Sequence, residues 1–136
     1  MNVTISPIQG NRQVTVLQLQ GRLDAAAYRY LIATARTLYD MGTRHIILDL
    51  SGTSHISCSG LVALHSIAVA LQGNAPPDLD AGWNAIHAVE EDLARGSQTH
   101  LKLLNVPPQV DRLLARSGFK HYVQTYADLD AAVASC

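Results

Sequence analysis

The stretch of sequence from Ile46 to Leu64 constrains the fold more than any other part of the chain. It opens with an apolar run rich in branched side chains, residues 46–50, which is typical of a strand buried on both faces. Small polar turn formers follow, and the apolar residues after them recur at spacings of three and four, as in a helix. The stretch therefore predicts a buried strand, a turn and the first turns of a helix.

Three small residues surround the predicted start of that helix. Ser57 and Ser59 are both good N-cap residues, and Gly60 follows them directly. We expect the helix to begin at about residue 59, so that its unpaired N–H groups and the positive end of its dipole face residues 57–59. An anion, a phosphorylated hydroxyl or a thiolate is favoured at such a place, and Cys58 lies at its centre.

The chain before this stretch predicts a hairpin and a helix. Residues 1–6 and 14–18 alternate between apolar and polar side chains on either side of a turn signal. Residues 21–24 stop the second strand, and Asp24 is a suitable N-cap for a helix that ends at Gly42. The apolar stripe of this helix consists of Ala27, Leu31, Ala35 and Leu38.

The chain after the stretch contains an insertion and then further strand and helix patterns. Residues 72–100 begin with loop chemistry, and Trp83 is the first of several apolar residues with helical spacing over 78–96. We therefore expect an inserted amphipathic helix near 80–95. Beyond it, the patterns predict a strand at 101–106, a helix from Pro107-Pro108 to Gly118, a strand at 122–126 and a short helix at 128–134.

Three motifs, in the same order, resemble the STAS domain of bacterial anti-sigma-factor antagonists. The first is Gly21-Arg22-Leu23-Asp24, and the third is the proline-started helix that ends in Ser117-Gly118-Phe119. The second is Asp49-Leu50-Ser51 followed, after a turn, by Ser57-Cys58-Ser59-Gly60-Leu61. The resemblance implies a single STAS-like α/β domain over residues 1–136, with a mixed sheet of about five strands, packed helices and the insertion at 72–100.

The resemblance also implies a function and a switch. Antagonists of this family bind an anti-sigma factor of the serine-kinase type and so release a sigma factor. In members regulated by phosphorylation the acceptor serine follows an Asp, whereas this chain has Ser57 for the Asp and Cys58 for the acceptor. We therefore expect no phosphorylation at position 58, and Ser57 and Ser59 remain as displaced hydroxyls, which a kinase tolerates poorly.

The helix after the switch predicts a binding surface. Its positions Leu61, Leu64, Ala68 and Leu71 are expected to face the core. The other face then carries an exposed valine pair beside the switch, which is typical of a protein-binding surface. The expected partner-binding residues are Ser54, His55, Val62, His65, Ser66 and Val69.

Two other functional classes stay open at this point. A scaffold or accessory role, in a stressosome-like assembly or beside a membrane transporter, fits a stand-alone domain nearly as well. A thiol enzyme built on Cys58 would need a base and an orienting group, and His55 is the only base nearby in the sequence. A separation of three residues across a turn does not by itself place His55 on the thiol, so we expect no catalytic residue. No cofactor is expected either.

Composition narrows the class of partner. A formal net charge of −1 argues against electrostatic binding of nucleic acid. The six histidines form no i, i+4 pair, and none has a Cys or carboxylate at ligand spacing, so no metal is expected. Two isolated cysteines fit a reducing compartment, and no apolar stretch is long enough to cross a bilayer. With the resemblance, these features predict a cytoplasmic bacterial protein, and a homo-oligomer remains open.

Overall fold

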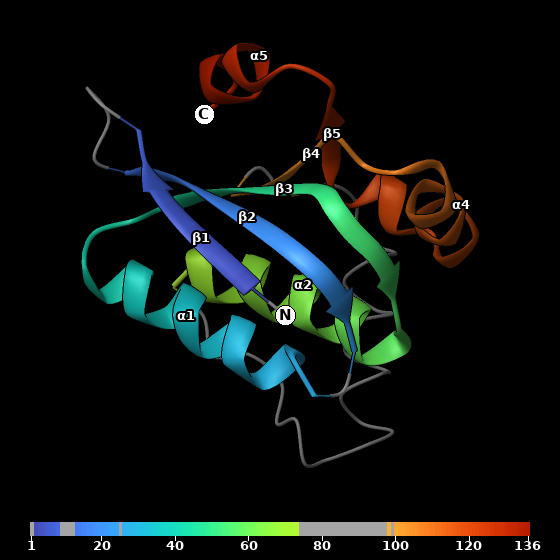
Figure 1. The fold of residues 1–136 in the computed structure, drawn as a ribbon. Helices are drawn as coiled ribbons and strands as arrows, with labels where there is room; N and C mark the ends of the chain where they lie inside the picture. Colours follow the sequence, from blue (N-terminus) through green and yellow to red (C-terminus); the bar gives the residue numbers. More distant parts are fainter. Residues whose placement is uncertain (1, 9–12, 25, 74–97, 99) are drawn as a thin grey trace.

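The computed structural model describes residues 2–8, 13–24, 26–73, 98 and 100–136, and its centre is a five-stranded sheet with the strands in chain order (Figure 1). β1, Asn2–Pro7, pairs antiparallel with β2, Val14–Leu23. The other strands continue the sheet in parallel with β2; they are β3, His45–Ile56, β4, Leu101–Leu104, and β5, Gln124–Tyr126. The predicted mixed α/β sheet and its N-terminal hairpin are confirmed.

The described helices pack on both faces of this sheet. α1, Tyr28–Asp40, and α2, Cys58–Leu71, lie side by side on one face, and α5, Leu129–Ala134, lies on the other (Figure 1). α4, Pro108–Ser117, packs beside β3, and a 3₁₀ helix, Phe119–His121, connects it to the last strand. The helices on both faces explain why the central strands carry apolar side chains in both directions.

The core is divided by the sheet into two clusters. Ile46, Leu48 and Leu50 of β3 belong to the larger cluster, together with buried side chains of α1, α2 and α4. Ile47, between them in the sequence, points to the other face, because side chains alternate along a strand. That smaller cluster, under α5, consists of Val14, Val16, Ile47, Leu104 and Ala132. The prediction that the run at 46–50 is buried on both faces holds for its apolar residues.

The start of α1 differs from the prediction. β2 continues past Gly21 to Leu23, with register shifts against β3, and Gly21 takes a φ of 112°. α1 then begins only at Tyr28, because the Asp24 carboxylate accepts a hydrogen bond from the Ala26 N–H at 3.0 Å and closes a local turn. Asp24 therefore shapes the approach to the helix and is not its N-cap. The predicted apolar stripe of α1 is nevertheless buried.

The C-terminal third follows the predicted order with shorter strands. β4 stops at Leu104, and Asn105 has a left-handed φ of 54°. The 3₁₀ helix occupies residues before β5, which therefore begins at Gln124. Gly118 ends α4 with a φ of 83°, as predicted, and the Asp128 side chain caps α5. The predicted helix near 80–95, with Trp83, lies outside the described residues.

A close approach of α2 to β2 leads to the first prediction. A Cβ on Gly60 would lie 2.7 Å from both the Leu23 carbonyl oxygen and Ile56 Cγ2. We expect Gly60→Ala to lower the free energy of unfolding by about 1–3 kcal/mol in a urea titration, although alanine is the better helix former. Ser59→Ala, on the preceding residue, should change it by less than about 0.5 kcal/mol. Equal stability of Gly60→Ala and the unmodified chain would contradict the close approach.

Candidate functional site

The switch segment lies where β3 ends and α2 begins. Ser57 is the N-cap of α2, and its Oγ accepts a hydrogen bond from the Gly60 N–H at 3.3 Å. The Leu23 carbonyl oxygen accepts two further bonds from Ser57, from the hydroxyl at 3.4 Å and from the N–H at 3.0 Å. α2 therefore begins at Cys58, one residue before the predicted start, and its first turn is tied to the end of β2.

The two cysteines occupy different environments. Cys58 is the first residue of α2, but its side chain lies outside the described part of the structure, so the predicted role of its thiol stays a prediction. Cys136 follows α5, and burial raises the pKa of its thiol, while the charge of Lys102 opposes part of that rise. Because the thiolate is the nucleophile, Cys136 is a poor candidate for thiol chemistry.

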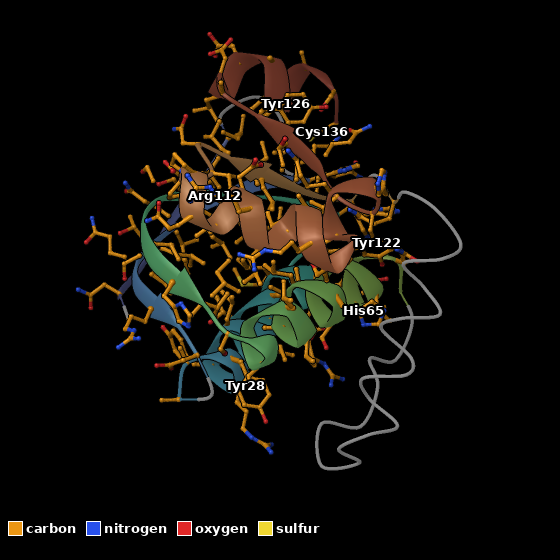
Figure 2. The ribbon with its side chains drawn as sticks, turned by 90° about the vertical axis from the view of Figure 1, so that its right-hand side faces the viewer. Tyr28, His65, Arg112, Tyr122, Tyr126 and Cys136 are labelled. Atoms are coloured by element: carbon orange, nitrogen blue, oxygen red, sulfur yellow. The ribbon has the colours of Figure 1, made fainter. Side chains whose placement is uncertain are left out.

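The predicted exposure of the second face of α2 is wrong for three of its four residues. His65 and Ser66 are fully buried, and Val69 is 8% exposed. α2 packs against the sheet and α1. The ring centroids of His65 and Tyr122, both labelled in Figure 2, are 6.0 Å apart. Of the four predicted residues, Val62 alone is half-buried. Most of this helix is therefore core, and the accessible part of the site lies at its N-terminal end.

The exposed part of the site is the edge of the sheet where β2 and β3 end. Ser54 and His55 are exposed there, and Arg22 of β2 lies opposite His55 in the strand register. An opening of about 440 Å³ lies beside Arg22. Its lining residues are Arg22, Asp24, Ala26, Ala27 and Tyr30. Tyr30 is 59% exposed, so an aromatic ring is available to a partner at this edge.

A second opening, a groove of about 220 Å³, lies between the end of β3 and α4. It is lined by Ser54, His55, Ile56, Gln109, Val110, Leu113 and Arg116. Sequence reasoning identified Ser54 and His55 but missed the residues of α1 and α4 around both openings. Only the topology could have indicated them: β2, β3 and β4 are parallel, so α1 and α4 both begin at the edge where ligands of open α/β sheets bind.

The described part of the structure contains neither a candidate metal cluster nor a candidate membrane span. Among the described residues, no group of three His, Cys, Asp or Glu side chains could hold a metal ion. None of the helices in the described ranges is long and apolar enough to cross a membrane. What the edge offers is exposed polar, cationic and aromatic side chains around two openings.

The family is established by a comparison with domain models. The model of the STAS domain matches residues 6–75, just over half of the 136 residues, and the chain belongs to this family. The match runs from the end of β1 through α2, so it includes the switch segment and the ends of β2 and β3. A search of curated proteins finds no match.

Solved structures share the fold at low sequence identity. A protein described as an anti-sigma factor antagonist of Thermotoga maritima has a TM-score of 0.70 at 14% identity, over 97% of this chain and 92% of that chain. Bacillus SpoIIAA in its phosphorylated form has a TM-score of 0.56 at 17% identity, over 99% and 100% of the two chains. The murine anion transporter Slc26a9 has a TM-score of 0.62 at 16% identity, over 93% of this chain and 18% of that chain. The predicted STAS fold is confirmed.

The Ser57 cap leads to a second prediction. Ser57→Ala removes the acceptor for the Gly60 N–H, and we expect it to lower the free energy of unfolding by about 1 kcal/mol. Ser57→Asp keeps an acceptor and adds a negative charge at the helix N-terminus, so it should recover most of that loss. Urea titrations at one pH compare the three proteins. If Ser57→Ala were as stable as the unmodified chain, the cap would have no energetic role.

The burial of α2 leads to a third prediction. Val69→Glu places a carboxylate in an 8% exposed position, and we expect it to lower the melting temperature strongly or to prevent folding. Val62→Glu changes a half-buried residue of the same helix and should lower the melting temperature clearly less. Thermal melting followed by circular dichroism measures both. Equal, small effects of the two variants would mean that Val69 is accessible in solution.

Proposed function

We propose that this chain is a regulatory protein-binding module of the anti-sigma-factor-antagonist kind. It binds an anti-sigma factor of the serine-kinase type through the sheet edge and so releases a sigma factor, and it catalyses no reaction itself. Membership of the STAS family supports this role, as do neighbours in fold that are named anti-sigma factor antagonists. The role implies a bacterial protein that acts in the cytoplasm.

The observation that carries the proposal is the position of the switch segment on an accessible edge. Ser54 and His55 are exposed, and the buried Ile56 separates them from the Ser57 cap. The half-buried Val62 follows on the first turns of α2. The hydrogen bonds of Ser57 to Leu23 and Gly60 tie the segment to the end of β2 and the first turn of α2. A partner would therefore meet a preformed surface, which reduces the entropy cost of binding.

The proposed regulation of binding depends on Cys58. It aligns with the acceptor serine of the family motif, and a neighbour in fold, SpoIIAA, has been solved in a phosphorylated form. A thiol offers such a kinase no hydroxyl, so the domain is not switched off by phosphorylation at this position. Oxidation of Cys58 would be a different control at the same place, since a helix N-terminus lowers the pKa of a thiol.

Phosphorylation of the purified proteins tests this part. After incubation with ATP and a serine-kinase-type anti-sigma factor, we expect no phosphate on the unmodified chain and one phosphate on Cys58→Ser, because only the variant has a hydroxyl at the acceptor position. Intact-mass spectrometry measures both. Ser59→Ala is the control, because it removes a neighbouring hydroxyl and should behave like the unmodified chain. A phosphate on the unmodified chain would contradict the proposal.

A second candidate function is a scaffold or accessory role, in a stressosome-like assembly or beside a transporter. The observation in its favour is the similarity in fold to a segment of the transporter Slc26a9, of which the match covers 18%. The two candidates differ in one assay: only the antagonist displaces a sigma factor from a purified anti-sigma–sigma complex. Formation of large homo-oligomers without displacement would favour the second candidate.

A further inference from the structure

The groove between β3 and α4 combines an apolar floor with a polar and cationic rim. Ile56 and Val110 are 1% and 2% exposed and form the floor, with the half-buried Leu113 beside them. The exposed rim consists of Ser54, His55, Gln109 and Arg116. An apolar floor inside a polar rim is the arrangement that protein interfaces use for an anchoring side chain.

The charge of this region is uncompensated. Arg112 and Arg116 are exposed and lie four residues apart, on one side of α4; Figure 2 labels the first of them. Neither forms a hydrogen bond or ion pair with any residue of the described ranges. Asp111, the acidic residue of the same helix, is already bound to Lys120 at 3.0 Å, and no lining residue of the groove carries a carboxylate.

Several other cations among the described residues have partners of their own. Arg44 donates to the Tyr39 carbonyl oxygen at 2.8 Å, and its guanidinium lies 3.9 Å from the centre of the Tyr39 ring. Lys102 is buried and donates to the Ser135 carbonyl oxygen at 3.1 Å. Arg22, by contrast, is exposed at the same sheet edge and adds charge of the same sign.

The size of the groove indicates what it can hold. Its volume of about 220 Å³ is below the roughly 300–1,000 Å³ of typical small-molecule sites. It therefore suits one apolar side chain better than a nucleotide or another cofactor. The charges around it would attract carboxylates on either side of that anchor.

We propose that this groove binds a short acidic segment of a partner protein, with one apolar side chain on the floor and flanking carboxylates on Arg116 and Arg112. The inference deepens the proposed function, because it names the chemistry of the partner. It rests on that function, which requires the partner to be a protein. Nucleic acid fits less well, because the lining carries no Phe, Tyr or Trp on which bases could stack, and the chain has a formal net charge of −1.

A titration followed by nitrogen–proton NMR spectra tests this inference on the full chain. The probe is a blocked peptide with one leucine flanked on both sides by glutamates, and the same peptide with lysines in place of glutamates is its control. We expect the acidic peptide alone to shift the amide signals of residues 54–56 and 109–116. Arg116→Glu should weaken its binding about tenfold, because the variant replaces an attractive contact with a repulsive one. Arg116→Lys, which keeps the positive charge, should lose less affinity for the acidic peptide.

Arg36→Glu is the matched control for the charge change. Arg36 is an exposed residue of α1 that does not line the groove, and the variant should bind the acidic peptide like the unmodified chain. Four results would overturn the inference: equal binding of both peptides, shifts outside the groove only, the same shifts with inorganic phosphate alone, or binding to anionic lipid vesicles in place of the peptide. Failure of the peptide while the anti-sigma factor still binds would overturn this inference and leave the proposed function standing.

Discussion

The Leu23 carbonyl oxygen is the point on which the site depends. This oxygen, at the end of β2, accepts hydrogen bonds from the N–H and from the hydroxyl of Ser57. The Ser57 hydroxyl oxygen in turn accepts a hydrogen bond from the Gly60 N–H at the start of α2. The lack of a side chain on Gly60 lets the helix approach this carbonyl. One serine and one glycine therefore join two neighbouring strands and a helix, and they fix the direction in which the switch segment faces the solvent.

This attachment explains why the edge of the sheet, and not the length of α2, is the available surface. Once its first turn is tied to β2, α2 runs between α1 and the segment of Tyr122, and His65, Ser66 and Val69 become part of the core. The accessible residues of the site lie at the edge of the sheet where β2 and β3 end, beside α4. In the proposed function this edge is the surface that meets the partner, and the apolar helix behind it contributes to the stability of the domain.

Local signals in the sequence predicted the elements well, because each depends on neighbouring residues. Ser57 caps α2 and Gly118 ends α4, as predicted. The exposed face of α2 was mispredicted because His65 and Ser66 are polar, and a polar pair on a helix usually faces water. Its burial depends on packing against distant segments. The groove of α4 likewise arises from the strand order, which brings Arg116 to the end of β3.

Hydrogen exchange of the chain, alone and bound to a purified serine-kinase-type anti-sigma factor, tests the central claim most directly. Amides buried by a partner exchange more slowly, so the experiment reports the bound surface without any substitution. The account predicts added protection at the sheet edge, in residues 54–61 and 109–116, and no change in α5 on the opposite face. Protection confined to α5 and the outer side of α1, with the edge unchanged, would contradict it.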